Sequence, residues 1–593
     1  MLTFFYGGTG TGKSYAMMDK IKQAAENGRK VCVIVPDQFT FEYEHMLYNH
    51  LGCALFNKGN TEVWSFSRLA ADIFRCTKAP EGMGADSTVK TAVMYKVIRL
   101  ISEREGLLFF DKQAKRASFA NTALTMLSEL IHSGVTPEVL GEILKTAPDN
   151  MRDKLTDLFL IYSEYSSELA ALGMRDILLD SRLAADMAEQ NGYFNDMCLF
   201  MDEFKSFTGD QYNMIRVMLS QCAELTVCMT SDDIGKGGFG PFTAVNETCA
   251  GLSSIAAELG KKINKVKFDD NKRYKSEELF ELSKDLLRLP SKAYNGDGGN
   301  ITLVTAPDIY GECDYICAAI CELTAADRSL RYSDIAVLSR AMNDDISVLA
   351  PHFERYNIPY YSDKKRPTGH KPLMLMVTAA LELAAEKKPS TEVLLRYAKT
   401  GLTQVSEEDI AYLENYCYTW DIDGSMWQSE FPDEKAGDIR LRLLSPINSL
   451  KKACSGKTGA QICDALRSFI GETGAEEKLL SFEGKYITEA ESAAQIRENQ
   501  WLCSQLDEIF ASLEQALTEK ISLSDFRDIF MLSAEKITLA APPDALDGVI
   551  AQQSDLARLT NPKIVFVMHA NDGIFPFNTG ESSTFSERER EFF

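Results

Sequence analysis

The segment Gly7–Ser14 holds the residues whose spacing most clearly indicates chemistry. It reads GGTGTGKS and fits the pattern G-x-x-x-x-G-K-[ST]. Glycines allow backbone N–H groups to converge on phosphate oxygens, which predicts a cradle for ATP. We expect Lys13 to reach the β- and γ-phosphates and Ser14 to offer its hydroxyl to Mg²⁺. An ordinary glycine-rich turn is the alternative. The expected nucleotide-binding residues are Gly7, Gly8, Thr9, Gly10, Thr11, Gly12, Lys13 and Ser14.

Two adjacent carboxylates are the expected partners of this loop. Asp202 and Glu203 directly follow the apolar run Met197–Met201. Ligands bind at the carboxyl ends of strands in open α/β sheets, so a strand here would deliver both acids to a site. Asp202 is expected to hold Mg²⁺, and Glu203 to orient or deprotonate an attacking water. Lys13, Asp202 and Glu203 form the predicted catalytic set; a solvated pair after a strand is the alternative.

The elements around the loop predict a parallel sheet. The apolar run Leu2–Tyr6 precedes it, and Tyr15–Asn27 has helical periodicity that stops at Gly28. Further strands are predicted at Lys30–Val35 and Glu62–Phe66. Strands that alternate with helices indicate a sheet covered by helices.

The rest of the chain repeats this layout. Residues 86–190 show helical patterns only, and strand signals return at Met197–Met201 and Leu225–Thr230. A second β/α unit is predicted to open with strand Ile301–Thr305, and residues 372–540 are again mainly helical. A strand at Ile564–Met568 resumes that unit.

The long separation between loop and carboxylates excludes some classes of protein. Small kinases and GTPases place the acid much closer to the loop. A helical block between the two motifs suits DNA motors whose first RecA-like domain carries an insertion.

Composition excludes other classes. The 593 residues contain 63 Lys and Arg against 86 Asp and Glu, a net charge of −23, which argues against a polybasic DNA binder but not against DNA held in a local channel. No secretory signal or membrane-spanning stretch is recognised, and the 14 cysteines contain no C-x-x-C pair, so a cytoplasmic protein with free thiols is expected. Cys313, Cys317 and Cys321 share one face of a predicted helix, and a buried face is favoured over a metal site.

Several further blocks make the sequence similar to a known family. After the phosphate loop come Val35–Thr40 (VPDQFT) and Trp64–Ala70 (WSFSRLA). Further blocks are Asp334–Arg340, Asn357–Pro359, Arg396–Leu402, Leu413–Tyr416 and Asn571–Pro576 (NDGIFP). The chain resembles the AddB or RexB family, whose members form one of the two subunits of the bacterial ATP-dependent helicase/deoxyribonuclease AddAB.

The resemblance implies an α/β fold with two RecA-like P-loop domains, each with a mainly helical insertion. Residues 1–85 and 191–290 would form domain 1A, with 86–190 as insertion 1B. Residues 300–371 and 541–593 would form domain 2A, with 372–540 as insertion 2B. The chain would be an N-terminal fragment that ends before the family's nuclease domain and its iron–sulfur cluster, because a capping box at Ser586–Glu589 starts a helix close to the last residue.

The same resemblance implies function and partners. A heterodimer with the AddA helicase–nuclease would resect double-stranded DNA ends for recombination and repair. The AddB component would read the Chi hotspot in single-stranded DNA, and its motor is generally regarded as inactive. Here the pair Asp202–Glu203 is intact, whereas only six residues precede the phosphate loop and leave no room for an adenine-binding glutamine motif. We therefore expect the chain to bind ATP together with Mg²⁺. We expect it to hydrolyse ATP slowly or not at all. Arg273 is weakly aligned with a γ-phosphate arginine.

DNA contacts are expected after the core strands, where stacking and phosphate neutralisation take place. The candidates are Gln38, Phe39, Trp64, Ser65, Phe66 and Arg68, each of which could equally pack in the domain core. The segment 86–190 is not markedly basic and is a candidate docking surface for AddA. His370 and His569 lack metal-ligand spacing and are expected to be structural. A self-sufficient helicase and a DNA-reading scaffold with structural nucleotide remain as alternative functions.

Overall fold

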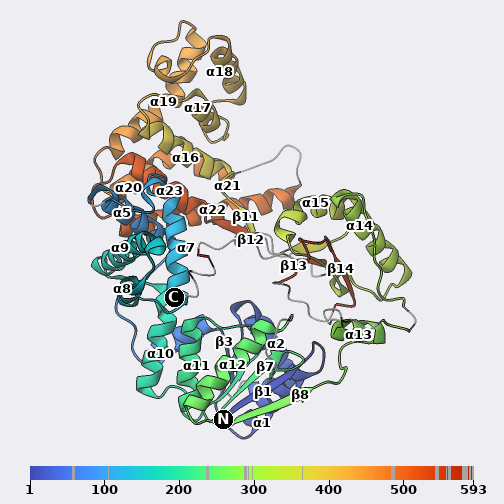
Figure 1. Cartoon of the computed structure of the whole chain (residues 1–593). Helices are drawn as coiled ribbons and strands as arrows, with labels where there is room; N and C mark the ends of the chain where they lie inside the picture. Colours follow the sequence, from blue (N-terminus) through green and yellow to red (C-terminus); the bar gives the residue numbers. More distant parts are fainter. Residues whose placement is uncertain are drawn as a thin grey trace.

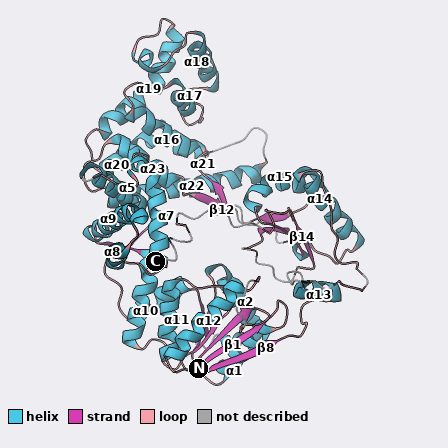
Figure 2. Cartoon of the chain, in the orientation of Figure 1, coloured by secondary structure: helices cyan, strands magenta, loops and turns pink. Residues whose placement is uncertain are grey.

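The structure is a computed structural model of the whole chain. It describes residues 1–593 except 57–60, 105, 236–239, 286–289, 291–292, 297, 363–364, 482–487, 541–546, 556, 558–561, 577–584, 587–588 and 590–593. Figure 1 shows two sheet-containing lobes and a large helical body, and Figure 2 shows that most strands gather in the two lobes.

The first lobe is built on a six-stranded parallel sheet with the order β3-β2-β6-β7-β1-β8. The strands are β1 (Leu2–Gly7), β2 (Val31–Ile34), β3 (Thr61–Trp64), β6 (Cys198–Met201), β7 (Glu224–Thr230) and β8 (Ile263–Phe268). β8 escapes detection in the sequence because it is an edge strand with mostly exposed, polar positions. The predicted parallel α/β arrangement is confirmed.

Helices cover both faces of this sheet. Leu2 and Phe4 of β1 pack in one hydrophobic cluster and Phe5 packs in another, as the alternation of side chains along a strand requires. The helices are α1 (Lys13–Glu26), α2 (Thr40–Leu51), α3 (Cys53–Phe56), α4 (Phe66–Cys76), α10 (Asp180–Asn191), α11 (Gly209–Gln221) and α12 (Thr243–Glu258). α13 (Glu277–Asp285) lies on the way to the second lobe.

The second lobe contains a four-stranded parallel sheet with the order β10-β13-β9-β14. Its strands are β9 (Ile335–Ser339), β10 (Tyr360–Ser362), β13 (Val549–Gln553) and β14 (Ile564–Val567), and its helices are α14 (Ile309–Ala326) and α15 (Met342–Arg355). Cys313 and Cys317 of α14 are buried in the core of this lobe, as favoured from the sequence. Among the described residues, no group of three or more His, Cys, Asp or Glu side chains is arranged to hold a metal ion.

The predicted strand Ile301–Thr305 is wrong. These residues carry no strand pairing and all five are exposed, with 91% of Leu303 accessible. β14 therefore stands at the end of the sheet, with Val565 and Val567 partly accessible. A run rich in β-branched residues indicates a strand only when a neighbouring strand pairs with it.

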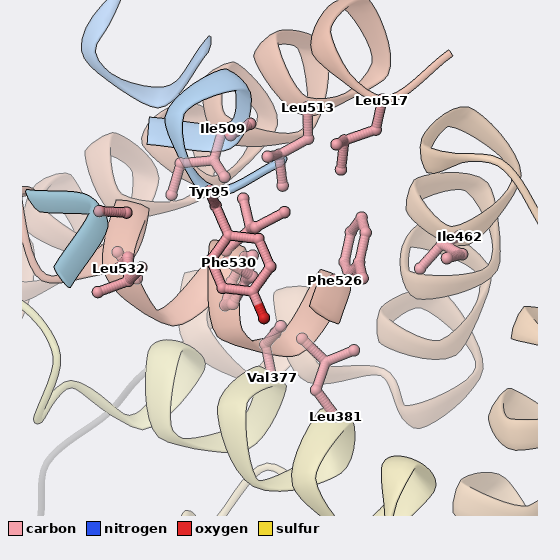
Figure 3. Packing of buried hydrophobic residues seen from close by; sticks show 14 of the residues in the cluster. Tyr95, Val377, Leu381, Ile462, Ile509, Leu513, Leu517, Phe526, Phe530 and Leu532 are labelled. Atoms are coloured by element: carbon pink, nitrogen blue, oxygen red, sulfur yellow. The ribbon is translucent and has the colours of Figure 1, made fainter. Parts of the chain in front are cut away.

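The helical body joins the two predicted insertions. A single hydrophobic cluster contains residues from 85–174 and from 373–534. Figure 3 shows Tyr95 of α5 beside Phe530 and Leu532, with Val377 and Leu381 on the neighbouring helix. From the first segment come α5 (Ser87–Arg104), α6 (Asp111–Ala114), α7 (Phe119–His132), α8 (Pro137–Thr146) and α9 (Asp149–Ala171). From the second come α16 (Pro372–Ala385), α17 (Thr391–Ala398), α18 (Glu407–Thr419), α19 (Glu434–Cys454), α20 (Gly459–Thr473), α21 (Ala475–Leu480), α22 (Glu489–Ala516) and α23 (Leu523–Ala534).

Two short strand pairs close the stems of the helical segments. β4 (Met83–Ala85) pairs in parallel with β5 (Met174–Asp176) on either side of the first segment. β11 (Lys365–Pro367) pairs antiparallel with β12 (Thr538–Ala540) on either side of the second. Each pair therefore keeps the two ends of a helical segment next to each other, where that segment joins its lobe. None of the helices among the described residues has the length and apolar character needed to cross a membrane.

Candidate functional site

The glycine loop lies between β1 and α1, as its motif requires. Lys13 is buried, and its ammonium donates to the Gly8 carbonyl at 2.6 Å. The Thr11 hydroxyl donates to the same carbonyl at 2.9 Å. Gly10 and Gly12 have φ angles of 71° and 89°, in the left-handed region where a side chain is strained. The loop is therefore tightly folded around its own backbone.

Close packing explains the need for glycine at position 10. A Cβ atom there would lie 2.7 Å from the Cβ of Arg273. The carbonyl of Gly10 also accepts a hydrogen bond from the backbone N–H of Lys272 at 2.9 Å. The segment after β8 thus lies directly on the loop.

Asp202 and Glu203 follow β6, two strands from β1 in the sheet. Asp202 is buried and accepts a hydrogen bond from the Tyr43 hydroxyl at 3.1 Å. The Ser14 side chain lies close enough to lower the pKa of Asp202. The Glu203 N–H donates to Asp202 at 2.9 Å. Glu203 has φ 66°, a conformation in which non-glycine residues are strained and which is frequent at functional sites. The structure thus joins the phosphate loop to the carboxylate pair.

Desolvation shifts the ionisation of all three predicted catalytic groups. It lowers the pKa of Lys13, against the opposing charges of Cys228, Asp202 and Glu203. It raises the pKa of Asp202, although the nearby Ser14 side chain and the hydrogen bonds from the Glu203 backbone and Tyr43 act the other way. Glu203 is exposed on the cavity wall, and partial desolvation of its carboxyl there, together with the charge of Asp202, raises its pKa to about 7. A bound divalent cation would reverse the shift on the two carboxylates.

A turn at residues 271–274 covers the loop. The Asn271 side chain accepts from the Tyr274 N–H at 2.9 Å and donates to the Tyr274 carbonyl at 2.7 Å. The Tyr274 hydroxyl is 2.8 Å from the Thr9 hydroxyl. Arg273 lies close enough for its charge to lower the pKa values of both Lys13 and Glu203. Sequence reasoning missed Lys272 and Tyr274 here, and it missed Tyr43.

The site opens into a cavity of about 2930 Å³ between the two lobes. The loop, Asp202, Glu203 and Arg273 line one side. The other side is lined by residues of the second lobe, including Glu312 and His569. His569 lies 3.3 Å from a carboxylate oxygen of Glu312 and 3.3 Å from one of Asp345.

The residues fit ATP and Mg²⁺ by their chemistry. The glycine loop provides a backbone surface at a helix N-terminus, which favours phosphate. Ser14 and Asp202 place a hydroxyl and a carboxylate side by side, and oxygen atoms are the ligands that Mg²⁺ prefers.

The six DNA candidates lie in different environments. Ser65 and Phe66 are buried: the Ser65 hydroxyl caps α4 by accepting from the Arg68 N–H at 3.2 Å, and Phe66 packs with Phe204 and Phe207. The partly buried side chains are Gln38, Phe39 and Trp64, whose indole donates to Glu62 at 3.3 Å. Arg68 is exposed and lies 3.7 Å from Glu44.

Fold and site together define an α/β protein with a glycine loop and a carboxylate pair suited to a nucleotide. Residues 4–283 match the family model described as "ADDB, N-terminal". Proteins named as the B component of an ATP-dependent helicase/deoxyribonuclease are similar along the chain. The one from Clostridium botulinum strain Loch Maree is 27% identical over 100% of this chain and 54% of its own length. Those from Clostridioides difficile strain 630 and Thermoanaerobacter sp. strain X514 are each 28% identical over 100% of this chain and 53% of theirs.

Residues 4–283 thus carry the domain that the family model describes, and the whole chain is similar to proteins named as the B component. It spans about half the length of the curated relatives that it matches.

Proposed function

We propose that this chain is the helicase-like portion of the AddB component of an ATP-dependent helicase/deoxyribonuclease. The observation that carries this proposal is that the glycine loop, with Lys13 and Ser14, lines the same cavity as the buried Asp202, in a chain similar to that component along its whole length. The two lobes would act as RecA-like domains 1A and 2A, with the segments 86–190 and 372–540 as insertions 1B and 2B.

In this proposal the glycine loop binds ATP. Backbone N–H groups of the loop and of the start of α1 donate to the phosphate oxygens, and Lys13 leaves the Gly8 carbonyl to reach the β- and γ-phosphates. Ser14 and Asp202 hold Mg²⁺, which neutralises phosphate charge when bound. Arg273 supplies a second cation at the same end of the site, and its position supports the weak alignment in the sequence.

Hydrolysis would depend on Glu203, which lines the cavity beside Asp202 and has a pKa near 7. An unprotonated Glu203 can orient or deprotonate water. We expect slow turnover or none. Steady-state ATPase measurements with single-stranded DNA should show little activity, and Lys13→Ala should weaken ATP binding at least tenfold. Robust turnover that disappears in Lys13→Ala would instead support the self-sufficient helicase, the second candidate that the intact Asp202–Glu203 pair favours.

The proposed partners are AddA and DNA ends, and the proposed role is resection of double-strand breaks with reading of the Chi hotspot in single-stranded DNA. Arg68 is the most exposed of the DNA candidates, with 53% of its side chain accessible. Arg68→Ala in the complex with AddA should reduce single-stranded DNA affinity and the hotspot response. A hotspot response that survives Lys13→Ala would favour a DNA-reading scaffold in which nucleotide is structural. The iron–sulfur cluster and nuclease residues stay predictions for the part of the protein beyond this chain.

A further inference from the structure

A second cavity lies where the two helical segments meet. Its volume is about 370 Å³. Its walls come from α5, α7 and the turn between α23 and β12, and they contain two lysines and no carboxylate. The lining residues are Ser87, Lys90, Asn121, Leu124, Thr125, Ser128 and Lys536.

Lys536 brings an unneutralised charge to this cavity. Its ammonium donates to the hydroxyl of the fully buried Thr91 at 2.6 Å. Within the described part of the chain, no carboxylate lies within ion-pair distance of it. Lys536 is an exposed residue, but partial desolvation of its ammonium beside Thr91 and the charge of Lys90 both lower its pKa. An anion in the cavity would raise the pKa of Lys536 again, because its negative charge stabilises the ammonium.

Lys90 is already paired. Its ammonium lies 2.8 Å from Asp176, which also accepts from the Tyr165 hydroxyl at 2.9 Å and the Leu178 N–H at 3.0 Å. Asp176 neutralises Lys90, so Lys536 supplies the net positive charge of the cavity. Asn121 adds an amide whose oxygen is buried without a hydrogen-bond partner, and an amide that turns over presents N–H donors instead.

The elements beside the cavity include α7 and the turn that precedes β12. Figure 1 shows α7 and β12 on the side of the helical body that faces the two lobes. The chain has a net charge of −23, so a cavity with a positive charge is opposite in sign to the protein as a whole.

We propose that this cavity binds a phosphate group, with Lys536 as the main cation and Lys90 and Asn121 as neighbours. The phosphate belongs either to the backbone of single-stranded DNA or to free inorganic phosphate. Only the DNA source rests on the proposed function. Because the cavity has walls from both helical segments, a bound phosphate would also tie these segments together.

The test uses Lys536→Met, with Lys536→Arg to retain the charge and Lys520→Met as a control on the same helical body outside the cavity. Thermal unfolding is followed with and without inorganic phosphate at constant ionic strength. Binding of a dT15 oligonucleotide is followed by fluorescence anisotropy between 50 and 300 mM salt. Thermal unfolding without phosphate checks that each variant folds.

If the DNA backbone is the source, Lys536→Met lowers dT15 affinity several-fold and reduces the slope of log K against log salt by about 0.7. Lys536→Arg and Lys520→Met behave like the unaltered chain. If free phosphate is the source, phosphate raises the unfolding temperature of every chain except Lys536→Met, and dT15 affinity is unchanged. A chain that binds no dT15 at all overturns the proposed DNA handling but leaves the phosphate measurement valid. Overlapping results for Lys536→Met and Lys520→Met in both measurements overturn the phosphate site.

Discussion

At the scale of single residues, the site depends on buried polar groups that hold one another. Asp202 is buried, yet it accepts hydrogen bonds from the Tyr43 hydroxyl and from the backbone N–H of Glu203. A buried carboxylate without such partners would be costly. Tyr43 comes from α2 and donates to this carboxylate, so its substitution should disturb Asp202 without changing the sequence of the glycine loop.

Glu203 makes the stability of the chain depend on pH. Its pKa is about 7 in the folded protein, against an ordinary value of 4.5. Between these two values the folded state holds more protons than the unfolded state, so the contribution of Glu203 to stability falls as pH rises from about 4.5 to about 7. Glu203→Gln removes this titration. Urea unfolding at pH 5.5 and pH 8 should show that the variant loses less stability over this range than the unaltered chain.

The matched control is Glu247→Gln, an exposed position on α12. It should keep the pH profile of the unaltered chain. An identical loss of stability in the Glu203→Gln chain would show that the surroundings of Glu203 do not disfavour its charge.

At the scale of elements, pairing decides which apolar runs become strands. Ile335–Ser339 and Ile301–Thr305 are both apolar runs with β-branched residues, but only the first has neighbouring strands on both sides. Val337 is fully buried in β9, whereas Leu303 is 91% exposed. The two positions therefore offer a direct comparison within one lobe.

Leu303→Asp should change the free energy of unfolding by no more than about 0.5 kcal/mol, because an exposed side chain loses no packing. Val337→Asp should destabilise the chain by about 3 kcal/mol or more, because it places a charge in a core. Chemical denaturation of both variants measures the difference. A large loss for Leu303→Asp would mean that the 301–305 segment pairs or packs in solution.

At the scale of the whole molecule, the helical body is one packing unit built from two separate stretches of chain. Tyr95 of α5 donates to Asp525 at 2.8 Å, and Arg99 lies 3.2 Å from the same carboxylate. The Lys536–Thr91 hydrogen bond and the shared hydrophobic cluster add to this junction. The two segments are therefore expected to unfold together.

Phe530→Ala tests this coupling. Phe530 is fully buried in the shared cluster, and truncation should cost about 3–5 kcal/mol. Hydrogen exchange should rise in α5 and in α22–α23 to a similar extent, while the first lobe keeps its protection. Increased exchange restricted to α22–α23 would show that the segments are independent.

The sequence by itself determined the local features of this protein: the glycine loop, the apolar strands that lead to it, and the helices with clear periodicity. These depend on residue type and on contacts between near neighbours, so they can be read without the fold. Only the tertiary structure decided that Tyr43 and Tyr274 join the site, that β8 pairs at the sheet edge, and that two helical segments share one core. Such contacts link residues that are far apart in the chain, and no local pattern records the distance between them.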